Sequence, residues 1–301
     1  MTHHLAQRNM HMTALPQDPA APARVVVYYQ THHVDGTLVS PVELVRRSPS
    51  LTAIIVGAIH VNAEPGDITL NDDPADHPGN DSMWAELAAV QEQGVAVIGM
   101  LGGAAMGSFE RLEPANFATY YPHLRELVTK YRLNGLDLDV EEDMSLEGAQ
   151  HLIEALRADF GPDFLITLAP VATALSGGGN LSGFDYEELF KSHGAEIAWM
   201  NTQFYCGWGV LDGTGEYDAI ISRGVFPASK VVAGTTTHPM HGKGYVEPAV
   251  LNETVASLAA KYPDFGGMSA WEYFNSEPGG VAAPWEWAQS MAAAMQRGRT
   301  A

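Results

Sequence analysis

The chain has 301 residues, of which 46% are hydrophobic, 9% aromatic and 17% charged. This composition is typical of a globular protein, and the length allows two domains of average size or one barrel of about 250 residues or more. Sixteen Lys and Arg against 36 Asp and Glu give a net charge of −20, and a surface this acidic repels phosphate groups, so we expect neither nucleic acid nor a membrane as a partner.

The first segment, residues 1–23, has neither the basic start nor the apolar core of a signal peptide, and we expect a flexible N-terminal tail there. No apolar run further along approaches the length of about 18 residues that a transmembrane helix needs. Cys206 is the single cysteine, which excludes an intramolecular disulfide and favours a reducing compartment. We therefore expect a cytoplasmic location, with secretion by another route left open. We also expect a monomer.

Beyond residue 23 the chain alternates short apolar runs with amphipathic stretches. The runs are almost continuously apolar, which is typical of strands buried on both faces. The predicted strands are Val25–Tyr29, Ala53–Ile59, Val95–Leu101, Leu136–Val140, Phe164–Ala169, Ile197–Phe204, Val231–Gly234 and Gly267–Trp271. Apolar residues at helical spacing predict helices over Ser82–Gln93, Pro114–Tyr131, Ser145–Phe160, Val250–Tyr262 and Trp285–Met295.

Eight strands at intervals of roughly 30 to 40 residues, most of them followed by a helix, predict eight βα units. No linker or shift in composition divides the series, so we expect an α/β protein with a single (β/α)8 TIM barrel over residues 24–301. The alternative is a doubly wound open sheet, which would carry a glycine-rich loop after its first strand. Residues 29–33 contain no glycine. In a barrel the active site lies at the C-terminal ends of the strands.

The fourth predicted strand carries Asp137, Asp139 and Glu141 at every second position. Side chains alternate between the faces of a strand, so the three acids point into the barrel and the leucines and valine between them point to the helices. Buried like charges raise one another's pKa values, which makes this column costly. Such a column can hold a metal, or it can share protons up to a catalytic carboxylic acid at its top, Glu141.

The spacing of these acids bears on the mechanism of a glycosidase. A carboxylate nucleophile requires two carboxyls about 5 to 5.5 Å apart that face each other across the sugar. Neighbours on one strand do not flank a sugar in this way. They suit a substrate-assisted reaction, in which Glu141 protonates the leaving oxygen and Asp139 holds the substrate's own acetamido group for attack.

Several motifs resemble glycoside hydrolase family 18. Residues 134–141 resemble its Asp-x-x-Asp-x-Asp-x-Glu strand, with Asn134 in place of the first Asp, and residues 100–103 resemble its Ser-x-Gly-Gly motif, with Met100 in place of Ser. Residues 203–205 resemble its Gln-Phe-Tyr element, and Trp271 stands where the tryptophan under the −1 sugar is expected. Residues 156–172, 201–205 and 271–276 resemble the fungal endo-β-N-acetylglucosaminidases of this family. The resemblance covers about residues 24–298.

The resemblance implies a role for each matching residue. Glu141 would be the general acid and then the base, and Asp139 would orient the acetamido group and stabilise an oxazolinium intermediate. Asp137 would share a proton with Asp139, and Tyr205 would donate its hydroxyl to the acetamido oxygen. Asn134 would make a structural hydrogen bond only.

A second set of residues is expected to bind substrate. Gln203 would contact the same sugar, and Trp271 would form the floor of its subsite. For the others, which end strands or lie in adjoining loops, a role in core packing or local hydrogen bonding stays open. The expected substrate-binding residues are Gln203, Trp271, Tyr29, Gly102, Gly103, Trp208, His60 and Asn62.

The expected function is therefore an endo-β-N-acetylglucosaminidase that acts on an N-glycan or glycoprotein by retaining hydrolysis and has a capacity for transglycosylation. We expect no cofactor and no metal, although His238 and His241 leave a metallohydrolase barrel as a minor alternative. The main alternative is a chitinase that acts on chitin oligomers. A non-catalytic chitinase-like lectin is a further alternative, but such proteins typically lack the glutamate that is present here as Glu141.

Overall fold

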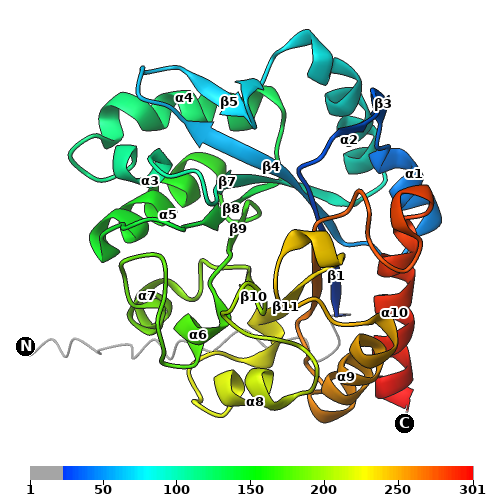
Figure 1. Ribbon diagram of the computed structural model, residues 1–301. Helices are drawn as coiled ribbons and strands as arrows, with labels where there is room; N and C mark the ends of the chain where they lie inside the picture. Colours follow the sequence, from blue (N-terminus) through cyan, green and yellow to red (C-terminus); the bar gives the residue numbers. More distant parts are fainter. Residues whose placement is uncertain (1–22, 301) are drawn as a thin grey trace, which may run out of the picture.

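The sheet closes on itself. In the computed structural model, which describes residues 23–300, every barrel strand pairs in parallel with two neighbours, and β1 pairs with both β4 and β12. The barrel strands are β1 (Arg24–Tyr29), β4 (Ala53–Val61), β7 (Ala96–Gly102), β8 (Gly135–Asp139), β9 (Leu165–Leu168), β10 (Trp199–Gln203), β11 (Val231–Thr236) and β12 (Gly267–Trp271). All eight predicted strands are confirmed, and with them the single (β/α)8 barrel (Figure 1). The predicted tail lies outside the described residues except for Ala23.

Helices surround the barrel (Figure 1). The five predicted helices are confirmed as α2 (Asp81–Glu92), α4 (Phe117–Lys130), α5 (Leu146–Phe160), α9 (Pro248–Lys261) and α10 (Trp285–Thr300). Five shorter helices were not predicted, because segments of four to eight residues are too short to show a helical period. These are α1 (Pro41–Arg47), α3 (Ser108–Arg111), α6 (Ala172–Leu175), α7 (Tyr186–His193) and α8 (Gly215–Ile221).

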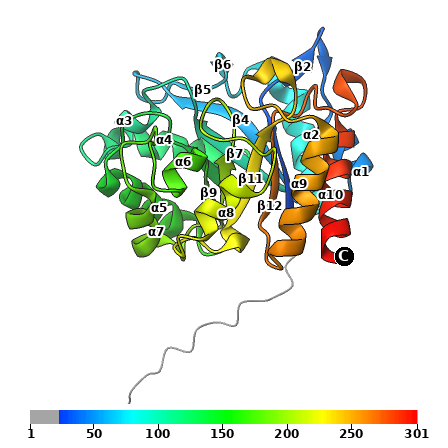
Figure 2. The same cartoon turned by 60° about the horizontal axis from the view of Figure 1, so that its bottom comes forward.

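Two small antiparallel β structures lie at the C-terminal end of the barrel strands. The antiparallel pair β2 (His33–Val34) and β3 (Thr37–Leu38) follows β1. Strands β5 (Ile68–Leu70) and β6 (Asp73–Pro74) follow β4, and β5 pairs antiparallel with β4 on one side and with β6 on the other. Both lie at the same end of the molecule in Figure 2. They extend the walls at the end where a barrel carries its active site.

The core has two layers, one inside the barrel and one between the barrel and the helices, because successive side chains of each strand point to opposite faces. In β1, Val26 and Tyr28 point into the barrel and pack with residues such as Ile55 and Val232. The intervening residues of this strand pack outward against the helices. In β8 the outward side chains are apolar, whereas Asp137 and Asp139 are buried inside the barrel. The predicted inward column of acids is therefore confirmed for these two residues.

Asn134 joins the start of β8 to neighbouring elements. Its Oδ1 accepts a hydrogen bond from the backbone N–H of Val97 at 2.8 Å and another from Gln91 Nε2 at 3.0 Å. The first bond connects it to β7 and the second to α2. The structural hydrogen bond expected for this residue is confirmed.

We expect Asn134→Ala to lower the free energy of unfolding by about 1 kcal/mol, because the backbone N–H of Val97 loses its acceptor. Asn134→Asp keeps an oxygen at the same place and should unfold within about 0.5 kcal/mol of the wild type. Urea denaturation of the three proteins measures both values. If the Asp variant is as unstable as the Ala variant, the hydrogen bond does not account for the effect.

Candidate active site

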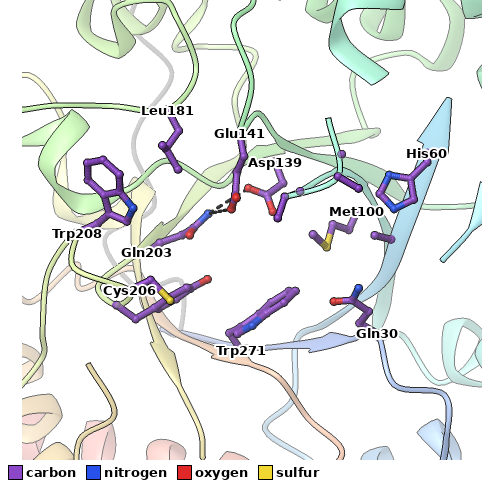
Figure 3. Close-up of a pocket in the computed structure, with 16 residues that line it drawn as sticks. Gln30, His60, Met100, Asp139, Glu141, Leu181, Gln203, Cys206, Trp208 and Trp271 are labelled. Atoms are coloured by element: carbon purple, nitrogen blue, oxygen red, sulfur yellow. Dashed lines mark hydrogen bonds between the residues drawn. The ribbon is translucent and has the colours of Figure 1, made fainter. Parts of the chain in front are cut away.

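A cavity of about 440 Å³ opens at the C-terminal ends of the barrel strands. Trp271, from the end of β12, lies across it from Asp139 and Glu141, which come from β8 and the residues after it (Figure 3). The residues that line the cavity are Gln30, Ala58, His60, Met100, Gly102, Gly103, Ala104, Ala105, Asp139, Glu141, Leu181, Gln203, Tyr205, Cys206, Trp208 and Trp271. Nine of the twelve residues predicted for the site are among them.

Asp137 lies below the cavity and is fully buried. Its Oδ2 accepts a hydrogen bond from Tyr28 Oη at 2.6 Å. Its Oδ1 accepts bonds from Thr167 Oγ1 at 2.5 Å and Asn201 Nδ2 at 3.0 Å. Burial raises the pKa of Asp137, while these hydrogen bonds act in the opposite direction. Because the donors come from β1, β9 and β10, this one carboxyl joins four strands of the barrel.

Asp139 lies one step higher, at the floor of the cavity. Burial raises the pKa of this carboxyl well above its usual range, and the negative charges of Glu141 and Asp137 raise it further. Gln203 Nε2 lies 3.1 Å from Asp139 Oδ1 and 3.2 Å from Glu141 Oε1, so one amide group bridges the two acids (Figure 3). The arrangement favours a proton on Asp139 and leaves the half-buried Glu141 at the cavity surface.

Tyr205 is buried and lines the same part of the cavity. Burial raises the pKa of its hydroxyl well above the ordinary value, and the charges of Asp139 and Glu141 raise it further. Its hydroxyl therefore stays protonated. Within residues 23–300 this hydroxyl makes no hydrogen bond, so it can donate one to a bound group.

Gly102 and Gly103 pass close beside Asp139, and the space there requires glycine. Their φ angles are 91° and 90°, in the left-handed region that side chains rarely adopt. A Cβ atom on Gly102 would lie 2.6 Å from the backbone oxygen of Asp139. The backbone N–H of Gly103 donates to that same oxygen at 2.9 Å. The close approach holds the end of β7 and the end of β8 together.

The two ends of the cavity differ in chemistry. Trp208, Cys206 and Leu181 lie toward one end, and His60 and Gln30 lie toward the other (Figure 3). Burial lowers the pKa of His60, so its ring is kept neutral over a wider pH range. One end therefore offers aromatic and apolar surface, and the other offers neutral polar groups.

Two predicted binding residues lie outside the cavity. Tyr29 is 1% exposed and packs outward among residues under the helices, with its ring 4.8 Å from that of His32. Its neighbour in β1, Tyr28, is the tyrosine that points inward. Asn62 donates to Thr69 Oγ1 at 3.3 Å within the β4–β5 hairpin. The position of Tyr29 in the outer core corrects the expectation that it binds substrate. Substrate binding by Asn62, which does not line the cavity, stays a prediction.

Sequence reasoning missed several residues of the site. Tyr28, Thr167 and Asn201 all donate to Asp137, and each was available as a polar residue inside an apolar strand. Cys206 lines the cavity, and burial together with the charge of Glu141 raises the pKa of its thiol, which disfavours a thiolate nucleophile. Gln30, which directly follows β1 and lines the cavity, belongs to no motif that would have identified it from the sequence.

Residues 23–300 contain neither a cluster of metal-ligating side chains nor a membrane-spanning helix. No three His, Cys, Asp or Glu side chains in this part of the chain come together as a possible metal site. His241 Nε2 lies 2.6 Å from Asn275 Oδ1, and His238 accepts a bond from the backbone N–H of Met240. No helix in the same range is long and apolar enough to cross a membrane.

Comparisons with known proteins agree with this geometry. The family described as glycosyl hydrolases family 18 matches residues 24–243. The chain is 46% identical to a fungal endo-β-N-acetylglucosaminidase of that family, with a TM-score of 0.85 over 90% of this chain and 97% of the other. It is also 46% identical to chitinase ChiC from Aspergillus fumigatus, with a TM-score of 0.83 over 91% of this chain and 100% of the other.

A curated relative is more distant. Chitinase 2 of Rhizopus oligosporus is 30% identical over 212 residues, which are 64% of this chain. The chain spans 36% of the length of that relative.

The raised pKa of Asp139 has a consequence for stability that pH reveals. Folding raises the pKa of this carboxyl above the value of about 3.9 that an Asp has in an unfolded chain. The stability that such a group contributes is fully present below that unfolded value and is lost as pH rises through the pKa of the folded state. Asn cannot ionise. We therefore expect Asp139→Asn to become progressively more stable than the wild type as pH rises above about 4.

The measurement is urea denaturation of both proteins at several pH values. Asp163→Asn, a change at an exposed position outside the cavity, is the control and should follow the wild type at every pH. Parallel curves for Asp139→Asn and the wild type would contradict the raised pKa.

Proposed function

The chain belongs to glycoside hydrolase family 18, and from this membership and the geometry of the cavity we propose that it is an endo-β-N-acetylglucosaminidase. It cleaves the N,N′-diacetylchitobiose core of N-linked glycans by retaining, substrate-assisted hydrolysis. Its partner is then the N-glycan of a glycoprotein.

The observation that carries the proposal is the position of the two acids. Among the described residues that line the cavity, Asp139 and Glu141 are the carboxylic acids, and both belong to one strand and its end. The wall that faces them is formed by Trp271 (Figure 3). A carboxylate nucleophile, or a carboxylate base that activates a water molecule for direct attack, would need to face the acid across the sugar. The nucleophile must therefore come from the substrate, which requires an N-acetyl group next to the anomeric carbon.

The chain's own residues then have distinct tasks. Once the substrate is bound, the proton that burial favours on Asp139 passes to Glu141, which leaves Asp139 as a carboxylate. Glu141 donates this proton to the leaving oxygen, and the acetamido oxygen attacks the anomeric carbon as that bond breaks. Asp139 accepts a hydrogen bond from the acetamido N–H and balances the positive charge of the oxazolinium, while Tyr205 donates to the acetamido oxygen. Glu141, now a carboxylate, takes a proton from water as the water opens the oxazolinium. The anomeric configuration is retained because two inversions occur.

The shape of the cavity favours a glycan core over a long linear polymer. Trp271 and Trp208 are the tryptophans among its lining residues, and Trp208 lies at one end only. The opposite end presents His60 and Gln30, which suit the many hydroxyl groups of a mannose branch. In addition, β11 and α9 are joined by only residues 237–247, which leaves no room there for an inserted domain that would deepen the cleft.

A chitinase is the second candidate, and a specific observation favours it. Chitinase ChiC from Aspergillus fumigatus is as identical to this chain as the endo-β-N-acetylglucosaminidase is. The same acids would perform the same reaction on chitin, since both substrates contain N-acetylglucosamine.

The two candidates are separated by mass spectrometry after digestion of a high-mannose glycoprotein and, in parallel, of chitin oligomers. We expect release of the intact glycan, with one N-acetylglucosamine left on each asparagine of the glycoprotein. Cleavage of the chitin oligomers alone would replace the proposal with the chitinase. Cleavage of neither substrate would remove both.

We expect Glu141→Gln to lower kcat at least about a hundredfold, because general acid catalysis is lost while the side-chain shape is kept. Binding of the glycan, measured by isothermal titration calorimetry, should remain close to that of the wild type. Glu110→Gln, at an exposed position that does not line the cavity, is the control. Normal turnover by Glu141→Gln would refute the assignment of the acid.

A further inference from the structure

Two buried glutamates directly follow residues that line the cavity. Glu142 follows Glu141, and Glu272 follows Trp271. Their exposed fractions are 6% and 7%. Neither forms a salt bridge with any residue in the described range 23–300. A buried carboxylate without a cation is costly unless hydrogen bonds satisfy its oxygens, so the groups that supply those bonds define what each glutamate does.

Glu142 binds the backbone of the loop after β7. Its Oε2 accepts from the N–H of Gly107 at 2.7 Å, and its Oε1 accepts from the N–H of Phe109 at 2.9 Å. These amides follow directly on the loop that starts with Gly103–Ala105, which lines the cavity. Glu142 therefore fixes the far end of this wall against the segment that carries Glu141.

Glu272 makes the equivalent contact on the other side of the cavity. Its Oε2 accepts from the backbone N–H groups of Gln30 and Thr31 at 3.1 and 2.8 Å. Its Oε1 accepts from Thr31 Oγ1 at 2.8 Å. Gln30 lines the cavity. Glu272 therefore fixes the end of β1 against the segment that carries Trp271.

We propose that Glu142 and Glu272 are positioning residues of the active site, each of which fixes one wall of the substrate cavity through backbone amides. The inference rests on the proposed glycosidase activity at this site. Neither side chain touches the reacting atoms. Their effect comes through the two walls that they hold, since displacement of catalytic or binding groups by about 1 Å can cost about a hundredfold in rate.

The different geometry of the two contacts predicts different responses to glutamine. In Glu272→Gln the oxygen that receives both backbone N–H groups can be kept, and the new amide can donate to the Thr31 hydroxyl, which can also accept. In Glu142→Gln each oxygen position faces a backbone N–H, so the new amide must oppose one of them. Glutamine should therefore preserve function at position 272 and impair it at position 142.

The experiment compares steady-state kinetics of the Ala and Gln variants at both positions, on whichever of the high-mannose glycoprotein or chitin oligomers the wild type cleaves. Glu86 is the matched control site, because its Oε2 accepts from the Val42 N–H and the Ser40 hydroxyl away from the cavity. We expect Glu142→Ala, Glu142→Gln and Glu272→Ala to raise KM and to lower kcat/KM about tenfold or more. We expect Glu272→Gln and both Glu86 variants to keep the wild-type KM.

A smaller folded fraction lowers the apparent kcat but leaves KM unchanged, so a raised KM reports a displaced wall. Wild-type KM in Glu142→Ala and Glu272→Ala would overturn the inference. If either Ala variant fails to fold, the KM values of Glu142→Gln and Glu272→Gln are compared instead. Equal KM values in these two variants would overturn the inference.

Hydrogen exchange separates failure of this inference from failure of the proposed function. If the wild type cleaves neither substrate, the proposed function fails. Exchange at the amides of Gly107 and Phe109 then still tests the contact, since it should be faster in Glu142→Gln than in the wild type. Exchange at Gln30 and Thr31 should stay slow in Glu272→Gln. Unchanged exchange at Gly107 and Phe109 would overturn the inference.

Discussion

The structure depends on the burial of a column of carboxyl groups inside a barrel that would otherwise be apolar. Asp137 and Asp139 are almost completely buried, and both have raised pKa values because burial disfavours their charged forms. The interior can hold them only if other strands supply donors. Tyr28 and Gln203 meet this need, each from a different strand. The same bonds that stabilise the acids therefore fix the relative positions of the strands that form the cavity.

The placement of the acids on one strand also limits the chemistry. Asp139 and Glu141 lie on one side of the cavity and Trp271 lies on the other (Figure 3). A sugar held against the tryptophan therefore meets both acids on a single side. This arrangement supports a reaction in which the sugar supplies its own nucleophile. The close approach of Gly102 to the backbone of Asp139 supports this arrangement, because a side chain at position 102 would collide with the end of the strand that carries the acids.

The sequence predicted the barrel and the column of acids well, and the errors have a common physical cause. In β8 polar and apolar residues alternate, so the face of each residue could be assigned. In β1 both faces are apolar, so the pattern could not show that Tyr28 points inward and Tyr29 outward. Short helices were missed for a related reason, although α1 begins with a local signal, since Ser40 caps it and proline follows.

The way in which the buried acids are satisfied bears on their protonation. Within residues 23–300, none of Asp137, Asp139, Glu142 and Glu272 pairs with a Lys or Arg, and neutral donors supply the hydrogen bonds of all four. A cation beside Asp139 would lower its pKa and hold it ionised. Neutral donors favour the ionised form less, so burial and the charge of Glu141 determine the outcome and raise the pKa. Because amides and hydroxyls supply the hydrogen bonds of its buried acids, the barrel can keep a proton on Asp139. The side-chain amide of Gln203 bridges Asp139 and Glu141.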